Sequence, residues 1–203
     1  MKPASERRSL DPEALAQLFL EARSPNSWTD TPVDEALLRR VYELARLGPT
    51  SVNSNPARFV WVRSPQAKER LASLASDRNQ RKILEAPVTA IIAHDLAFAD
   101  RMDVLFPHDP TTVQEKAWDV EWRDSTAFRN GTLQGAYLII AARALGLDCG
   151  PLSGFDNAAV DAEFLSDRPH LRSNFLCCVG YGASRYLFPR LPRFSFEDAN
   201  DFV

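Results

Sequence analysis

Apolar side chains recur every three or four residues in several stretches of the chain, which predicts amphipathic helices. Two of these stretches begin at Asp11 and Asp34, and two more follow Ser64 and Asp156. These four side chains accept hydrogen bonds from the free N–H groups of a first helical turn. The predicted helices cover residues 11–22, 34–47, 64–75, 79–84, 125–145 and 156–164.

Short apolar runs without helical spacing predict strands at residues 59–62, 88–93 and 174–180. Residues 88–93 are apolar at odd and even positions alike, which is typical of a strand covered by helices on both faces. Residues 95–124 lack a clear period and predict a long connection, either irregular or with a helix of its own. The alanine-rich stretch 125–145 is apolar around much of its circumference, which predicts a central, buried helix. Gly48 and Gly146 follow predicted helices and are expected to cap them.

The bulk composition is that of one globular domain spanning residues 1–203. Apolar residues make up 45% of the 203 residues, charged residues 25%, and the net charge is −3. This charge disfavours a nucleic-acid-binding surface, and no apolar run is long enough for a membrane span. The first eight residues are polar and do not resemble a signal peptide. We therefore expect neither nucleic acid nor membrane as a partner.

The three cysteines predict no metal or disulfide chemistry. Cys177 and Cys178 are adjacent within an apolar run, and Cys149 stands apart. No CxxC pair occurs, so a zinc or dithiol site is not supported. We expect small buried side chains in a strand and a reducing, cytoplasmic setting. The three histidines also lack the spacing of a metal site, although His108 lies in the long connection and is a candidate substrate contact.

Candidate chemistry lies in two segments rich in turn formers and in small hydroxyl or amide side chains, residues 48–56 and 150–156. Each follows a predicted helix and offers backbone N–H groups with few bulky neighbours. Such loops suit a polar, planar cofactor. The residues therefore favour a cofactor-dependent enzyme over a binding module.

These loops and the order of the elements resemble the FMN-dependent nitroreductase family from about Leu15 to Phe196. The similar stretches are residues 28–33, 48–58, 105–108, 126–130, 144–156 and 190–197. The resemblance implies an α+β, three-layer fold with a central, mostly antiparallel sheet flanked by helices. It also implies an intertwined homodimer with FMN at the subunit interface. The most similar branch is that of malonic semialdehyde reductases of pyrimidine catabolism.

The resemblance places the FMN site in five clusters. The side chains at positions 23, 24 and 26 and the arginine at 190 would hold the phosphate and ribityl chain, although Ala22 and Asn26 stand where the family has basic residues. Lys82 would stabilise the negative charge of the reduced ring, and the backbone near Gly154 would face the hydride-carrying atom N5. The implied FMN-binding residues are Arg23, Ser24, Asn26, Pro49, Thr50, Ser51, Asn53, Asn79, Lys82, Pro151, Leu152, Ser153, Gly154 and Arg190.

The implied reaction uses NADPH or NADH as reductant. The chain has no GxGxxG fingerprint, so the nicotinamide would visit the flavin and leave. The specific expectation is reduction of malonic semialdehyde to 3-hydroxypropionate, with Arg58 and Arg129 as candidate partners of its carboxylate. One alternative is a nitroaromatic or quinone reductase, favoured by aromatic residues within 98–122. Another is a flavin-binding or structural dimer without turnover, favoured by Ala22 and Asn26. Taken singly, Lys82 and Arg190 also fit ordinary surface charges.

Overall fold

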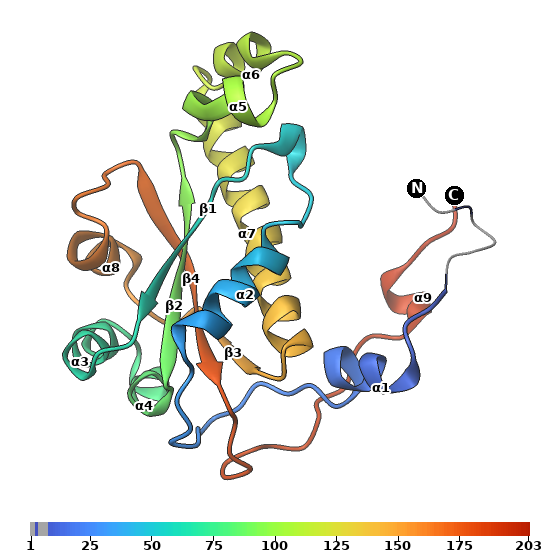
Figure 1. The fold of residues 1–203 in the computed structure, drawn as a ribbon, viewed down its shortest axis with the longest axis vertical. Coiled ribbons are helices and arrows are strands. Elements are labelled where there is room, and N and C mark those ends of the chain that lie inside the picture. Colours follow the sequence, from blue (N-terminus) through green and yellow to red (C-terminus); the bar gives the residue numbers. More distant parts are fainter. Residues whose placement is uncertain (1–2, 4–7) are drawn as a thin grey trace.

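The computed structural model describes residue 3 and residues 8–203. Its centre is a four-stranded sheet with the order β1-β2-β4-β3, in which every neighbouring pair is antiparallel (Figure 1). The second strand is buried at all eight of its positions, as its apolar run predicts. The strands are β1 (Ala57–Val62), β2 (Val88–Asp95), β3 (Asp148–Leu152) and β4 (Leu171–Gly180).

Helices cover both faces of this sheet, which confirms the predicted three-layer α+β fold. Figure 1 shows α2 (Glu35–Ala45) and α7 (Val120–Ala144) on one face. The other face carries α3 (Pro65–Ser73), α4 (Asp77–Glu85) and α8 (Asn157–Phe164).

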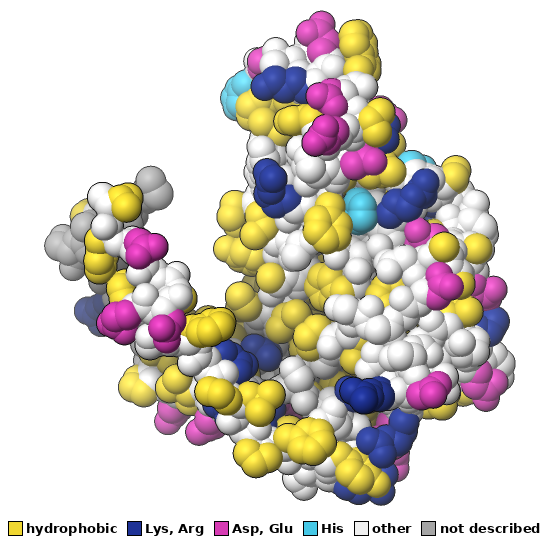
Figure 2. All heavy atoms as spheres, turned by 180° about the vertical axis from the view of Figure 1, so that it is seen from behind, with side chains coloured by type: hydrophobic (Ala, Val, Ile, Leu, Met, Phe, Trp, Pro, Cys, Tyr) yellow, Lys and Arg dark blue, Asp and Glu magenta, His cyan; other side chains and the backbone are white. Residues whose placement is uncertain are grey.

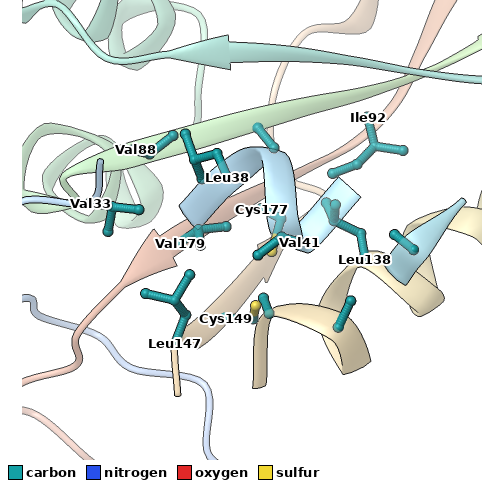
Figure 3. Packing of buried hydrophobic residues seen from close by; sticks show 14 residues of the cluster. Val33, Leu38, Val41, Val88, Ile92, Leu138, Leu147, Cys149, Cys177 and Val179 are labelled. Carbon is teal, nitrogen blue, oxygen red and sulfur yellow. The ribbon is translucent and has the colours of Figure 1, made fainter. Parts of the chain in front are cut away.

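Alternating side chains of the buried strands join the two helical layers. Ile92 and Cys177 pack with α2 and α7, whereas their neighbours Ile91 and Leu176 pack with α3, α4 and α8. The first of these clusters also includes Leu38, Val41 and Leu138 and is drawn in Figure 3. Because successive residues of a strand point to opposite faces, one apolar run supplies both halves of the core.

Capping side chains start α2 and α8 where the sequence predicts, whereas α4 and α7 begin before their predicted starts at residues 79 and 125. Asp34 accepts a hydrogen bond of 2.7 Å from the backbone of Leu37, and Asp156 accepts one of 3.0 Å from the backbone of Ala159. The first predicted helix begins with α1 (Pro12–Leu15) and closes as a π-helical turn, Ala16–Leu20, two residues before its predicted end. Gly146 caps α7 with a φ of 81°, as expected.

Gly48 does not act as the expected left-handed cap, because its φ is not positive. A Cβ atom at this position would lie 2.8 Å from Cδ2 of the Tyr137 ring on α7. The glycine therefore allows the segment after α2 to pass close to α7. Close packing, rather than backbone conformation, explains the residue.

Two further expectations were wrong in extent. Residues 150–152 are not loop but the end of β3, because β3 pairs with β4 from Asp148↔Gly180 to Leu152↔Leu176. The long helix is not buried all round. One side of α7 packs on the sheet, but Leu133, Tyr137 and Ile140 on other sides are 36–46% exposed.

Residues 96–119, most of the predicted irregular connection, form a helical cap with its own small core. The cap contains η4 (Phe98–Arg101), α5 (Met102–Leu105) and α6 (Pro110–Lys116). Phe98 and Met102 are 1% and 0% exposed, and Trp122 at the start of α7 packs against them. Figure 1 shows α5 and α6 beyond one end of the sheet, above α7.

The two ends of the described chain form an arm that projects away from the body (Figure 1). It consists of the first two helical turns and of the tail after Gly182, which includes α9 (Phe196–Ala199). Arg143 near the end of α7 donates a hydrogen bond of 3.3 Å to the carbonyl of Leu18 and so holds the base of the arm. None of the helices in the described part of the chain is long and apolar enough to cross a bilayer.

Candidate functional site

Two segments about 165 residues apart meet in a hollow of about 500 Å³ at the base of the arm. We call it the arginine hollow. Residues 22–26 form one wall and residues 187–193 the other. Among the residues that the structure describes, four arginines line it and no carboxylate side chain does, so the hollow suits an anion. The four are Arg23, Arg143, Arg190 and Arg193.

Hydrogen bonds to backbone carbonyls hold the two walls together. Arg190 donates to the carbonyls of Leu20 at 2.6 Å and Ala22 at 3.0 Å. Arg23 donates in the opposite direction, to the carbonyl of Phe188, and the Asn26 amide donates to the carbonyl of Tyr186 at 2.9 Å. The first and last predicted clusters are therefore neighbours. Asn26, in place of a basic residue, links the walls and leaves the positive charge to the arginines.

The third and fourth predicted clusters meet at the start of α4. The backbone N–H of Ser76 and the side-chain amide of Asn79 both donate to the carbonyl of Gly154, at 2.9 and 3.1 Å. A Cβ atom on Gly154 would lie 2.7 Å from the Ser76 hydroxyl and 2.9 Å from the Asn79 amide nitrogen. Only glycine fits this contact without a shift of the neighbours, so the residue is more than a plain turn.

Lys82 follows Asn79 by one helical turn and is half-buried. None of the carboxylates in the described residues lies within 4.0 Å of its amine. Of the remaining residues of the fourth cluster, Pro151 and Ser153 are exposed and Leu152 is not. The Leu152 side chain is 7% exposed within the core beside α3 and α4, so only its backbone is available to a ligand.

Arg81 joins the α4 region to the arginine hollow. Its guanidinium donates a hydrogen bond of 3.4 Å to the carbonyl of Asn26 and stacks on the Tyr186 ring at 4.1 Å. Gly150 on β3 lies against Trp28 and Pro25, which a Cβ atom would meet at 3.3 and 3.4 Å. The segment 22–28 thus runs along β3 and α4, and three of the predicted clusters share one side of the molecule with Arg190.

The second predicted cluster lies on the opposite face of the sheet, against α7. The backbone N–H of Ser51 donates to the side-chain oxygen of Asn130 at 2.8 Å, and the hydroxyl of Thr50 accepts from the backbone of Asn55 at 3.2 Å. Pro49 and Asn53 are exposed. Because the sheet separates this cluster from α4, a single chain does not bring it to the others.

Two buried amides of α7 that sequence reasoning missed hold this loop in place. Besides Asn130, Gln134 accepts a bond of 2.8 Å from the backbone of Ala57 and donates one of 3.1 Å to Asn55. They are 3% and 5% exposed. An amide pair spaced four residues apart among glycines and alanines was the signal that could have revealed them.

The loop itself holds non-glycine residues in the left-handed region. Val52, Asn53 and Asn55 have φ values of 47°, 52° and 43°. This conformation is costly for a β-branched residue such as valine. Val52 packs against the core of the helical cap, which offsets part of that cost. The loop is therefore rigidly placed between α7 and the cap.

The histidines and cysteines stay outside these clusters. Burial lowers the pKa of His94 below its usual value, which the carboxylates of Asp161 and Asp124 partly oppose. Burial raises the pKa of the Cys178 thiol to about 12, and Cys149 and Cys177 are also buried and free. Among the residues that the structure describes, no group of three or more histidine, cysteine or carboxylate side chains is arranged to hold a metal ion.

The sheet between two helical layers, the projecting arm and the helical cap define the class of protein as a nitroreductase-like α+β fold. The putative nitroreductase from Exiguobacterium sibiricum, solved in complex with FMN, has a TM-score of 0.84 at 20% identity, covering 97% of this chain and 99% of that one.

The sequence profile of the nitroreductase family matches residues 20–181. Two relatives named "Putative NADH dehydrogenase/NAD(P)H nitroreductase" match nearly end to end. One from a Caulobacter species is 53% identical over 94% of this chain and 96% of its own. HadB from Ralstonia pickettii is 52% identical over 92% and 95%. The chain belongs to the nitroreductase family, a family of oxidoreductases.

Proposed function

We propose that this protein is an FMN-dependent oxidoreductase that uses NADPH or NADH to reduce malonic semialdehyde to 3-hydroxypropionate in pyrimidine degradation. The observation that carries the proposal is the arginine hollow, joined through Arg81 to the Asn79–Gly154 contact. The names of the relatives support a nicotinamide reductant, and the FMN bound to the Exiguobacterium structure supports the cofactor.

The residues present fit FMN. Four guanidinium groups without a carboxylate suit a phosphate dianion, and Arg23 and Arg190 would hold it. Gly154 lets the 153–154 backbone approach α4, and its exposed surface leaves room for a flat ring. Lys82, without a carboxylate partner among the described residues, would stabilise negative charge on the reduced ring. Bound FMN supplies the chemistry, which is hydride transfer from the nicotinamide to the substrate.

We propose that the active form is an intertwined homodimer. The loop 49–53 lies on the face of the sheet opposite α4, so a second copy is needed to bring it to the flavin. Figure 2 shows hydrophobic side chains along the projecting arm and on the side of the body nearest to it. Phe188 and Phe194 belong to the tail after Gly182 and are 70% and 84% exposed, so a single chain leaves them uncovered.

The preference for an aldehyde acid rests on charge. Ser153 is small, neutral and exposed where many nitroreductases have a glutamate, so no negative charge would repel a carboxylate there. In the balanced reaction, hydride passes to the aldehyde carbon and a proton from solvent to its oxygen. No side chain is required as a nucleophile. The free buried thiols fit a reducing compartment, and we place the enzyme in the cytoplasm.

The alternative is a broad nitroaromatic or quinone reductase, which the names of the relatives favour. This alternative was also favoured by aromatic residues of the long connection, which were expected to form an open surface for flat substrates. Most of that support is lost in the structure. Phe98 and Trp122 belong to the core of the cap, whereas Trp118 is 81% exposed. A dimer without turnover is disfavoured because the arginine hollow keeps its positive charge despite Ala22 and Asn26.

The visible absorption spectrum of the protein loaded with FMN tests the proposal. Anaerobic NADPH should bleach the bound flavin, and malonic semialdehyde should restore its colour within one turnover time of the enzyme. If only a quinone or a nitroarene restores the absorbance of the oxidised flavin, the protein is the nitroaromatic or quinone reductase of the alternative. A protein that binds no flavin would contradict the proposed enzyme altogether.

A further inference from the structure

A second hollow, of about 480 Å³, lies between the loop 53–59, the end of α2 and the helical cap. We call it the cap hollow. It shares no residue with the arginine hollow. Three arginines, Arg46, Arg58 and Arg101, line it together with the polar side chains of Asn53 and Asn55, and none of its described lining residues is acidic.

The three arginines differ in how far their charge is compensated. Arg58 pairs with the buried carboxylate of Asp95 at 2.7 Å and also donates to the carbonyls of Asn55 and Ala57 at 2.9 Å each. Arg46 lies 3.3 Å from a carboxylate oxygen of Glu43. Arg58, a candidate for the substrate carboxylate by residue type, therefore has little capacity left for a ligand.

Arg101 is the uncompensated cation of the cap hollow. Within residues 8–203 it has no carboxylate within 4.0 Å and its side chain makes no hydrogen bond. Its neighbours hold its position, because Phe98 and Met102 are buried in the cap core on either side of it along the chain. The backbone of Arg101 is therefore held in place, while its guanidinium has no partner among the described residues. Such a guanidinium is suited to a carboxylate, which it can bind through two parallel hydrogen bonds.

The cap hollow is tied to the loop that the proposed dimer brings to the flavin. The side-chain amide of Asn53 donates a bond of 2.8 Å to the carbonyl of Leu105, at the end of α5. Val52 of the same loop packs into the cap core. In a dimer that places Asn53 beside the flavin of the partner subunit, Arg101 would lie in the same region, because both residues line the cap hollow. Arg129, the other candidate by residue type, lies instead beside Phe128 and Thr132 on a separate surface of α7.

We propose that Arg101 is a specificity-determining residue that binds the carboxylate of the aldehyde acid substrate. This inference rests on the proposed function, because it assigns one end of that substrate. The Arg101 guanidinium would hold the carboxylate, and bound FMN would supply the hydride chemistry at the aldehyde end. The residue selects acids over neutral aldehydes, and the bond-making step does not involve it.

Steady-state kinetics of Arg101→Gln and Arg101→Lys test the assignment. The glutamine variant should raise KM for malonic semialdehyde roughly tenfold, the effect of losing one charged, bidentate contact. The lysine variant should recover part of the loss. KM for propanal, which lacks the carboxylate, and the rate of flavin reduction by NADPH should stay unchanged. Arg40→Gln is the matched control, because Arg40 on α2 is also exposed and lies outside both hollows.

An equal loss with propanal, or no loss with either aldehyde, would overturn the assignment. A selective loss in the NADPH step would also overturn it, since the anion bound would then be a nucleotide phosphate. Calorimetric titration of the FMN-loaded protein with 3-hydroxypropionate and with its neutral methyl ester separates this inference from the proposed function. Suppose that the parent reduces only quinones yet binds 3-hydroxypropionate, and that Arg101→Gln loses this binding. The carboxylate site at Arg101 would then be supported, and malonic semialdehyde would be rejected as the substrate. If the parent does not bind 3-hydroxypropionate, the assignment of Arg101 as a carboxylate site is wrong.

Discussion

The arginines show how far one residue type can differ in its chemical role. Arg58 is neutralised by Asp95, whereas Arg101 has no carboxylate partner among the described residues. Arg190 bonds to two backbone carbonyls and lines a hollow whose described residues include no carboxylate. A guanidinium has five N–H donors, so Arg190 can hold the carbonyls of Leu20 and Ala22 and still contact an anion. We therefore expect Arg190 to bind the FMN phosphate.

Replacing Arg190 by alanine should raise the Kd for FMN about tenfold, because a charged hydrogen bond to phosphate is lost. The Kd for riboflavin, which has no phosphate, should change little. Fluorescence titration of the apoprotein with each flavin measures both values. Similar losses for the two flavins would assign Arg190 to holding the arm. Arg168→Ala is the control, because this partly exposed arginine pairs only with its neighbour Asp167 among acidic residues.

Among the elements, α7 holds the 50–57 segment in place, and its smallest side chains allow it to do so. Gly131 and Gly135 lie on its buried side, next to the amides of Asn130 and Gln134. A Cβ atom on Gly135 would meet the Phe175 ring at 2.6 Å and Ile92 at 3.3 Å. The glycines bring the helix close to the sheet, which places the amides within reach of the 50–57 segment.

Gly135→Ala should therefore destabilise the protein although alanine is the better helix former. The gain in helix propensity is about 1 kcal/mol, and overpacking against the Phe175 ring costs about 1–3 kcal/mol. Urea unfolding should show a net loss of about 1 kcal/mol. In a Phe175→Leu background, which removes the ring, the same substitution should be neutral or stabilising. A stabilised Gly135→Ala variant with Phe175 intact would contradict the packing argument.

At the scale of the whole molecule, the arm and one face of α7 leave large apolar side chains exposed on a single chain. Leu133 on α7 is 46% exposed, and Leu191 and Phe202 on the arm are 72% and 91% exposed. Burying apolar surface is favourable at roughly 25 cal/mol per Å². A second copy that covers these side chains would also bring the loop 49–53 to the α4 side of its partner, so we expect assembly and site formation to be coupled.

Leu133→Arg should weaken the proposed dimer, because it places a charge in an apolar contact. Light scattering after gel filtration should give about twice the chain mass of 22.8 kDa for the parent and a shift toward one chain mass for the variant. FMN retention should fall with dimer content. Val104→Arg, at a 63% exposed position on the cap, is the matched control. A monomeric parent that retains FMN would contradict the coupling.

Most elements of this fold could be predicted from local patterns. The apolar run of β2, the caps at Asp34 and Asp156 and the glycine after α7 act over a few residues, and the structure follows them. The family could also be recognised, because its loop motifs are contiguous stretches of sequence. The prediction for Gly48 was wrong, because a glycine is required there by close packing against the Tyr137 ring, about ninety residues later in the chain.

The state of each candidate side chain was decided in three dimensions. Nothing local predicts that Arg23 and Arg190 face one hollow, that Asp95 neutralises Arg58, or that Asn130 holds the 50–53 loop. Pairing, desolvation and close approach depend on distances between residues far apart in the chain. The sequence therefore determined the elements and the family, whereas the tertiary structure decided which charges remain available to a ligand.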